Sequence, residues 1–271
     1  MNFDWYSATL ESSPDQVLGV LESSQDLASV YPIRGLYSYD RGAAVRRGEH
    51  TLAQAFWGGV NGTKQVHVQA SGSDSPAIVE TIRRHWPSHR VSRADAREDW
   101  SHPSAWRWLC KRAIGVAEEF RLATGTVGDW IHARSGRTLY VGRPASRVRV
   151  RIYEKGKQLC ADPNWVRLEV IVRPTGAGKA ALASALPSQL MEASTWTREL
   201  AKRVGMPELD AVKVRDPWVP SDDEKALRWC VQQYGAVLGR KAAQLGGWAE
   251  LGTYIGAECY QVAAVKDATR H

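Results

Sequence analysis

The stretch from Arg147 to Lys155 carries the side chains with the clearest chemical potential in the sequence. Successive side chains of a strand point to opposite faces, which directs Val148, Val150 and Ile152 toward a core. The other face then carries Arg147, Arg149, Arg151 and Tyr153. A row of guanidinium groups ending in an aromatic ring suits a nucleic-acid backbone, and a solvated charged face is the alternative.

Two further predicted strands hold acids beside arginines. In one, Arg93 and Asp95 share a face, and in the other, Arg167 and Glu169 share a face. An acid in the middle of an apolar strand requires a partner. Neighbouring arginines satisfy this requirement in one interpretation, and a divalent cation held by oxygen ligands does so in the other.

Together these groups are the parts of a phosphodiester transesterase. A metal would polarise the scissile phosphate, and the Tyr153 oxygen would attack it, forming a covalent phosphotyrosine and freeing a 3′-hydroxyl. A free tyrosine has a pKa of about 10, so a lysine or the metal must favour the phenolate. Lys155 is the local candidate for that role. Tyr140 is a rival nucleophile, on a predicted strand without a row of arginines.

Composition favours a polyanionic partner. The 271 residues include 36 Lys and Arg against 29 Asp and Glu, a formal net charge of +7. No apolar run is long enough for a transmembrane helix, and the first residues lack the pattern of a secretory signal. We therefore expect a cytoplasmic protein without a membrane partner.

Several common enzyme and metal motifs are absent. The four cysteines are scattered without a C-x-x-C pair, which argues against a zinc finger or a disulfide scaffold. Gly178 and Lys179 hint at a phosphate loop, but Ala180 stands where the pattern requires Ser or Thr. No dinucleotide-binding or serine-hydrolase motif occurs.

The element pattern predicts an α+β fold with a mainly antiparallel sheet, flanking helices and a helical C-terminal region. Long helices do not follow every strand, which argues against a βαβ series. We expect strands at 3–9, 54–58, 64–70, 91–97, 138–142, 147–153 and 165–173, and a hairpin within 31–48. We expect helices at 14–27, 75–86, 103–123, 178–186, 187–204 and from 222 onward. Residues 1–174 are expected to form the catalytic domain, and residues 175–271 a helical region packed on the same unit.

Short motifs in a fixed order resemble the replication initiation factor family. Three of them are Thr138-Leu-Tyr-Val-Gly142, Arg151-Ile-Tyr153-Glu-Lys155 and Arg167-Leu-Glu169. Weaker matches are Phe3-Asp4-Trp5, the strand that ends at Ser71-Gly72, and Val91-Ser-Arg93-Ala-Asp95. The family includes rolling-circle initiators of small Gram-positive plasmids, similar proteins of filamentous phages, and relaxases of integrative elements. The resemblance covers about residues 2–174.

The resemblance implies a metal-dependent, sequence-specific DNA nicking and joining enzyme. Tyr153 would be the nucleophile and Lys155 its charged neighbour. The residues expected to contact DNA are Arg93, Arg147, Arg149, Arg151 and Arg167. Asp95 and Glu169, with His67, would hold Mg²⁺ or Mn²⁺; His67 has a purely structural role in the other interpretation. Asp4, Glu98 and Asp99 are weaker metal candidates.

The resemblance also implies partners and leaves alternatives open. Origin DNA, single-stranded or as a cruciform, is the expected substrate, with a host helicase and a second copy of the chain as further partners. Gln158 stands where the family often has an acid, and no second tyrosine lies one helical turn from Tyr153. A conjugative relaxase of similar chemistry and a non-catalytic DNA-binding regulator are the alternatives.

Overall fold

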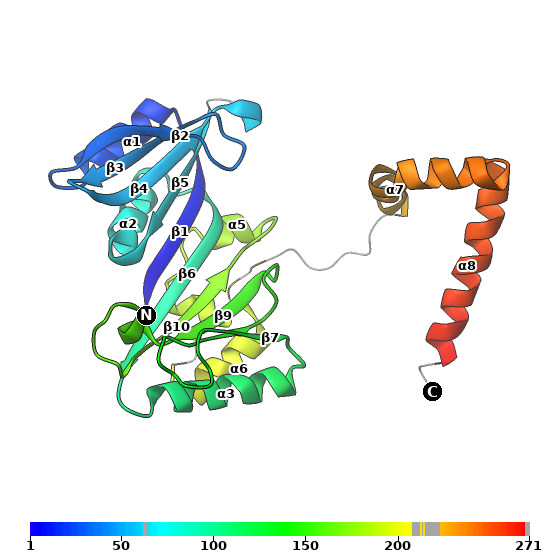
Figure 1. Cartoon of the computed structure of the whole chain (residues 1–271). Helices are drawn as coiled ribbons and strands as arrows, with labels where there is room; N and C mark the ends of the chain where they lie inside the picture. Colours follow the sequence, from blue (N-terminus) through cyan, green and yellow to red (C-terminus); the bar gives the residue numbers. More distant parts are fainter. Residues whose placement is uncertain (62–63, 208–211, 213, 215–222, 269–271) are drawn as a thin grey trace. The chain divides into compact units, whose positions relative to one another are not determined.

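The computed structural model describes residues 1–61, 64–207, 212, 214 and 223–268, and the chain divides into two compact units, Met1–Asp216 and Pro217–His271 (Figure 1). Each unit is described by itself. The larger unit contains the sheet and all residues singled out above. None of the described helices is long and apolar enough to cross a membrane.

Within the described residues the larger unit forms a ten-stranded sheet in which all neighbouring strands are antiparallel. The strand order is β2-β3-β4-β5-β1-β6-β10-β9-β8-β7. The strands are β1 Asn2–Glu11, β2 Ser29–Arg34, β3 Arg41–Arg47, β4 His50–Trp57, β5 Gln65–Ser71, β6 Arg90–Ser101, β7 Thr124–Val127, β8 Thr138–Val141, β9 Val148–Tyr153 and β10 Trp165–Val172. The predicted antiparallel α+β fold is confirmed.

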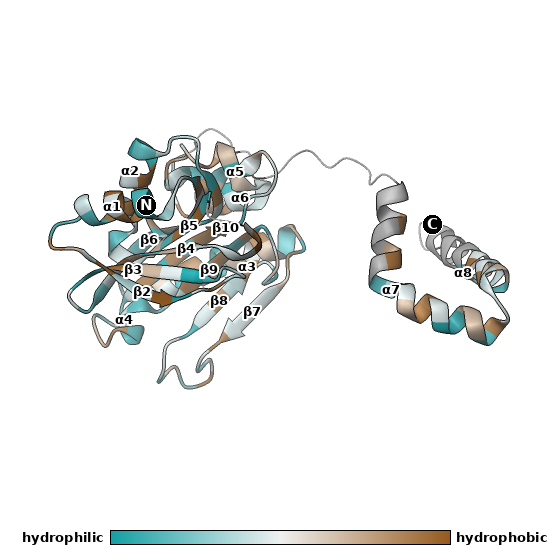
Figure 2. Cartoon of the chain, turned by 90° about the horizontal axis from the view of Figure 1, so that it is seen from above, coloured by the Kyte–Doolittle hydropathy of each residue, from teal (hydrophilic) through white to brown (hydrophobic). Residues whose placement is uncertain are grey.

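Helices cover one face of this sheet. These are α1 Pro14–Ser23, α2 Ser75–His85, α3 Ala105–Glu119, α5 Gly178–Ala181 and α6 Thr195–Arg203. The larger unit also contains the short helix α4 Lys155–Gln158, which follows β9, and the 3-10 turns η1 Gly59–Asn61, η2 Gly72–Asp74 and η3 Ser188–Ala193. Figure 2 shows α1, α2 and α6 on the same side of the strands. The apolar side chains of the strands point toward them, so Leu10, Val150 and Leu168 are buried with Leu109 of α3 and Leu200 of α6.

Local sequence explains where the helices begin. The Ser13 side chain accepts a hydrogen bond from the Gln16 backbone N–H, and Pro14 follows at the first helical position of α1. Ser194 and Thr197 form a capping box at the start of α6. Because Ser194 is extended, at φ −155° and ψ 159°, the helix predicted for 187–204 is instead divided into η3 and α6.

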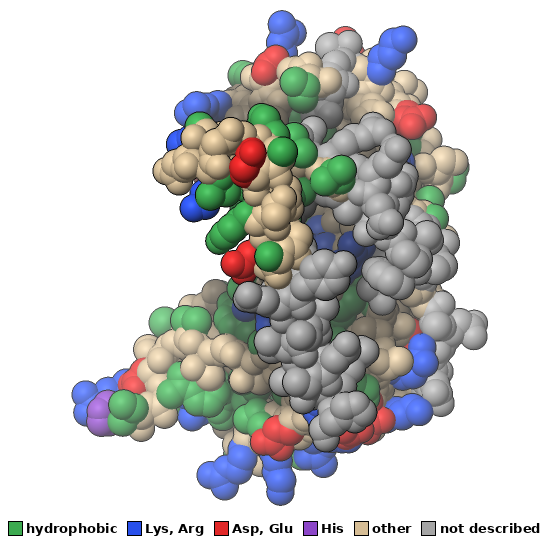
Figure 3. Space-filling model, turned by 90° about the vertical axis from the view of Figure 1, so that its right-hand side faces the viewer, with side chains coloured by type: hydrophobic (Ala, Val, Ile, Leu, Met, Phe, Trp, Pro, Cys, Tyr) green, Lys and Arg blue, Asp and Glu red, His purple; other side chains and the backbone are tan. Residues whose placement is uncertain are grey.

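The segment after β10 packs against the sheet and its helices. Arg83 of α2 donates a hydrogen bond to the Ala185 carbonyl at 2.6 Å, and Arg112 of α3 donates one to the Arg203 carbonyl at 2.7 Å. Figure 3 shows charged side chains of both signs at its lower end, where Figure 1 places α3 and α6. Between these two helices, Arg203 of α6 pairs with Glu119 of α3, and it also pairs with Glu199 within α6. The division into a catalytic domain of residues 1–174 and a helical region of residues 175–271 stays a prediction.

The smaller unit contains helices α7 Asp223–Leu245 and α8 Trp248–Ala268. They meet at Gly246 and Gly247, whose φ angles of 98° and 151° favour glycine. Ala242 and Leu251 are buried where the two helices pack. Hydrophobic and hydrophilic residues are interspersed along α7 (Figure 2), in keeping with the predicted helical C-terminal region.

Candidate functional site

The face of the sheet opposite the apolar side chains is lined by charged side chains, and it is called the polar face below. Strand register brings its members together, because Glu169 of β10 lies opposite both Arg97 of β6 and Arg151 of β9. Directly opposed residues in antiparallel strands share one face. The polar face comprises Arg93, Asp95, Arg97 and Asp99 of β6, Arg167 and Glu169 of β10, Arg149, Arg151 and Tyr153 of β9, and Tyr140 of β8.

At the centre of the polar face, Tyr153 contacts Glu169. The Tyr153 hydroxyl donates a hydrogen bond to Glu169 Oε1 at 2.6 Å, and Arg151 Nε donates one to Glu169 Oε2 at 3.0 Å. The Arg151 guanidinium also lies 4.6 Å from the centre of the Tyr153 ring. Glu169 is completely buried, so these two contacts compensate for the loss of water around its carboxylate.

Burial sets the protonation states of this pair. It raises the pKa of Tyr153, and the negative charge of Glu169 raises it further. Burial also raises the pKa of Glu169, against the opposing effect of the Arg151 charge. Tyr153 is therefore a neutral phenol at ordinary pH, with a carboxylate of increased basicity positioned to take its proton.

Lys155 flanks the same ring from the first residue of α4. Its Nζ lies 5.6 Å from the centre of the Tyr153 ring and donates a hydrogen bond to Gln158 at 3.2 Å. Burial and the positive charge of Arg167 lower the pKa of Lys155. Lys155 thus adds a positive charge beside the phenol without contacting its oxygen through any hydrogen bond described in the structure.

Two further arginines predicted to contact DNA are, like Arg151, held by carboxylates. Arg167 donates hydrogen bonds to Asp99 Oδ1 at 2.8 Å and to Asp4 Oδ1 at 3.0 Å. Arg93 donates one to Asp95 Oδ1 at 2.9 Å and stacks 4.8 Å from the centre of the Trp5 indole. Their predicted contacts with phosphate stay predictions.

The remaining two of these arginines are less constrained. The Arg149 guanidinium lies 3.8 Å from the centre of the Tyr140 ring, and its buried Nε makes no hydrogen bond to a described residue. Arg147 is exposed and contacts Thr175. Tyr140, the rival nucleophile, therefore also lies on the polar face, opposite Arg151.

The residues predicted to bind metal do not form one group. Asp95 pairs with Arg93, Glu169 pairs with Arg151, and His67 of β5 packs against Tyr37 and Tyr39 at ring distances of 5.8 and 5.9 Å. In the described part of the chain, no three His, Cys, Asp or Glu side chains are gathered so that they could hold a metal ion. Carboxylate oxygens suit Mg²⁺ and Mn²⁺, but in this arrangement they are occupied by guanidinium groups.

His67 provides a test of the fold at acidic pH. Burial, together with the positive charge of Lys179, lowers the pKa of His67 from 6.5 to about 4. Between pH 6.5 and about pH 4, His67 is protonated in the unfolded chain but neutral in the folded protein. The free energy of unfolding therefore decreases as pH falls through this range. We expect His67 to account for a loss of about 3 kcal/mol between pH 7 and pH 4, measured by urea unfolding.

The control for this prediction is His67→Gln, which should show a flatter dependence of stability on pH. Burial also lowers the pKa of His89, so the difference between the variant and the natural chain isolates His67. Equal slopes for the two proteins would contradict the prediction.

Arg97 of β6 belongs to the polar face, although no sequence motif marked it. Arg97 pairs with Asp4 at 3.3 Å and with Asp99 at 3.5 Å, and these acids also hold Arg167. The available signal was spacing, because Arg97 follows Asp95 by two residues and therefore shares its face. Asp4, singled out only as a weak metal candidate, is a partner for these two arginines.

Comparison with solved structures identifies the fold. The chain matches the structure of a rolling circle replication initiator protein from Geobacillus stearothermophilus, with a TM-score of 0.53 and 17% sequence identity. The match covers 82% of this chain and 89% of the other. This chain shares the fold of a rolling-circle replication initiator. No protein-family model matches the chain, and no curated protein matches its sequence.

The fold extends what the motifs predicted. The resemblance to replication initiators rested on short patterns within about residues 2–174, whereas the structural match covers most of the chain. The resemblance is confirmed at the level of the fold. The roles of Tyr153, Glu169 and the arginines are not tested by this comparison and remain predictions.

Proposed function

We propose that this protein initiates rolling-circle replication by nicking one DNA strand at a specific origin and later rejoining it. The observation that carries the proposal is the 2.6 Å hydrogen bond from the Tyr153 hydroxyl to Glu169, beside Arg151. In a fold shared with a replication initiator, this arrangement combines a nucleophile, a proton acceptor and a cation. Origin DNA is the proposed substrate.

The proposed nicking step is a transesterification. The Tyr153 oxygen attacks the scissile phosphorus while its proton passes to Glu169 Oε1. The bond between phosphorus and the 3′ oxygen breaks, and the departing 3′ oxygen takes a proton from water, which leaves a 5′-phosphotyrosine and a free 3′-hydroxyl. One phosphoester bond forms for each one that breaks, so the phosphotyrosine conserves the energy of the original bond. Attack by a 3′-hydroxyl on the phosphotyrosine therefore reverses the step and rejoins the DNA strand.

Arginines would position and stabilise the phosphate during this step. Arg151 lies against both the phenol ring and Glu169, so it is placed to offset charge on the phosphate oxygens. Arg149 of β9 and Arg147 just before it extend the positive charge along this edge of the site, where the phosphate backbone of the DNA strand would lie. A host helicase and a second copy of the chain remain proposed partners.

A requirement for divalent metal is a separate prediction. We expect nicking with Mg²⁺ or Mn²⁺ and none with EDTA, and we expect Asp95→Ala and Glu169→Ala to abolish nicking while much of the DNA binding remains. Oxygen ligands on the polar face would have to leave their arginines to bind the ion. Cleavage assays with and without metal, alongside filter binding, measure both effects; undiminished nicking by both variants in EDTA would contradict the prediction.

The deciding experiment uses supercoiled DNA of the protein's own replicon, incubated with the full chain and Mn²⁺ or Mg²⁺. We expect a nicked circle that carries covalently bound protein, detected as a product whose mobility changes after protease treatment. Cleavage only at a transfer origin would favour the conjugative relaxase. Binding without cleavage would overturn the proposal in favour of a DNA-binding regulator.

A further inference from the structure

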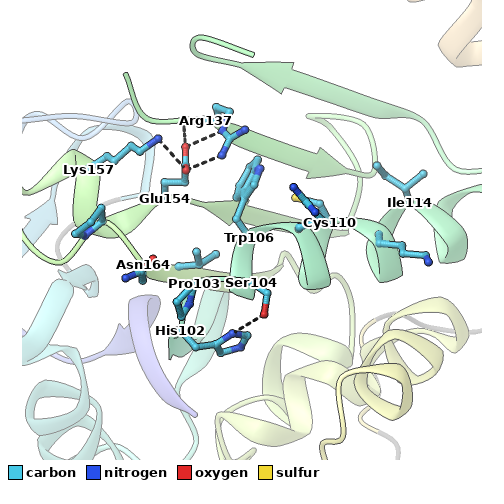
Figure 4. Close-up of a pocket in the computed structure, with 14 residues that line it drawn as sticks. His102, Pro103, Ser104, Trp106, Cys110, Ile114, Arg137, Glu154, Lys157 and Asn164 are labelled. Atoms are coloured by element: carbon cyan, nitrogen blue, oxygen red, sulfur yellow. Dashed lines mark hydrogen bonds and ion pairs between the residues drawn. The ribbon is translucent and has the colours of Figure 1, made fainter. Parts of the chain in front are cut away.

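A cavity lies beside α3, away from the polar face. It has a volume of about 940 Å³, and its walls include Trp106 and Cys110 of α3 and Val166 of β10 (Figure 4). Val166 faces the apolar side of the sheet, one position from Arg167 on the polar face. This cavity, called the α3 groove below, is lined in addition by Arg107, Lys111, Arg137, Glu154 and Lys157.

The α3 groove has an excess of positive charge. Arg137 and Lys157 share one acid, Glu154, at 2.8 and 3.0 Å, and Figure 4 shows them on opposite sides of its carboxylate. Arg107 and Lys111 are exposed one helical turn apart, and neither forms an ion pair with a described residue. Two cations are therefore left without a carboxylate, which suits consecutive phosphates of a polyanion.

Two tryptophans lie at this groove: Trp106 lines it, and Trp130, which is not one of the lining residues, packs against Trp106. The Trp106 and Trp130 rings are 5.5 Å apart, and the Arg137 guanidinium lies 4.8 Å from the centre of Trp106. Trp130 is 37% exposed, so one ring edge or face is available to a ligand. A half-exposed indole packed on a lining tryptophan, together with two unpaired cations in the same lining, suits a nucleotide, whose base stacks while its phosphate binds the positive charge. An acidic peptide would use the cations but not the rings.

We propose that the α3 groove binds a segment of single-stranded DNA, with phosphates on Arg107 and Lys111 and a base stacked on Trp130. Stacking requires an unpaired base, which excludes an intact duplex as the ligand. Glu154 lines this groove, whereas the preceding Tyr153 contacts Glu169 on the polar face. Two DNA segments would thus be held on opposite sides of the end of β9; this inference rests on the proposed function for its choice of polyanion.

The test uses crosslinking to an oligothymidine of about 20 nucleotides that contains 5-iodouracil, a length that spans more than one binding site. After irradiation of the full chain, digestion and mass spectrometry locate the crosslinked peptides. We expect crosslinks in the peptides that contain Trp106 or Trp130. Arg107→Glu combined with Lys111→Glu should abolish these crosslinks and lower affinity about tenfold or more.

A matched control is Arg47→Glu combined with Arg84→Glu, which makes the same change in net charge at exposed positions elsewhere in the larger unit. This control should keep the crosslinks at the α3 groove. Equal loss in both double variants, or crosslinks confined to other peptides in the natural chain, would overturn the proposal. Circular dichroism confirms that each variant is folded before binding is measured.

Two further measurements sharpen the result. Trp130→Ala should weaken binding of the oligothymidine but not of an abasic oligonucleotide of equal charge; equal effects on both would overturn the stacking contact. The oligothymidine contains no origin and is not cleaved. DNA binding at the α3 groove and nicking at the origin are therefore measured in separate assays, and either can fail without the other. If the protein nicks its origin but forms none of these crosslinks, the proposed function stands and the proposal that the α3 groove binds DNA is wrong.

Discussion

Tyr153→Phe is expected to form no covalent DNA adduct and to lose nicking by at least about 10³-fold, as when an enzyme loses its nucleophile. The substitution removes only the hydroxyl that donates to Glu169, and the ring stays against Arg151. DNA binding should therefore remain close to that of the natural chain. The measurement is cleavage of supercoiled replicon DNA, with and without protease, beside an equilibrium binding assay.

The matched control is Tyr140→Phe, which removes a tyrosine hydroxyl from the same polar face. Tyr140 stacks with Arg149 and has no described hydrogen bond to a carboxylate, so its loss should leave nicking within a few-fold of normal. An adduct formed by Tyr153→Phe but not by Tyr140→Phe would reassign the nucleophile. Mass spectrometry of the protease-treated adduct identifies the modified peptide directly.

Glu169→Gln has the second largest expected effect, a loss of nicking of about 10² to 10⁴-fold, the usual contribution of a general base. The amide keeps the shape of the side chain but cannot take the Tyr153 proton. In the natural chain, activity should rise with pH as Glu169 ionises, at a higher pH than for an ordinary glutamate, because burial raises its pKa. The Glu169→Gln variant should lack this rise of activity with pH. The measurement is the rate of single-turnover nicking as a function of pH.

The control for Glu169→Gln must separate catalysis from stability, because the change leaves the Arg151 charge beside a neutral amide. Glu192→Gln serves this purpose, since Glu192 is also buried and pairs with Arg198 at 2.6 Å in the helical segment after β10. We expect both variants to lose stability and only Glu169→Gln to lose nicking. Normal nicking by Glu169→Gln would show that another group accepts the proton.

Strong local patterns allowed most of the fold to be predicted. The apolar alternation of β9 and β10 and the capping residues of α1 specify their elements within a few neighbouring residues. Weaker signals were missed or misplaced. All four residues of β7 are exposed, so no alternation marks the strand. The helix predicted to reach Leu27 ends at Ser23, and Leu27 itself has a φ of 55°.

The sequence by itself determined which residue types share a face of each strand. Side chains alternate in any strand, so Arg149, Arg151 and Tyr153 had to lie together whatever the strand pairs with. The same rule placed Arg167 with Glu169. These inferences required no knowledge of neighbouring strands, and the register of β9 with β10 agrees with them.

Only the tertiary structure decided which of these groups meet. Tyr153 contacts Glu169 because β9 and β10 pair in one register, and a shift by one residue would move one partner to the other face. The partners of Arg167 lie far along the chain, in Asp4 of β1 and Asp99 of β6. Such pairings are fixed when the strands align so that the whole apolar face of the sheet is buried together. The sequence of a single strand does not contain that information.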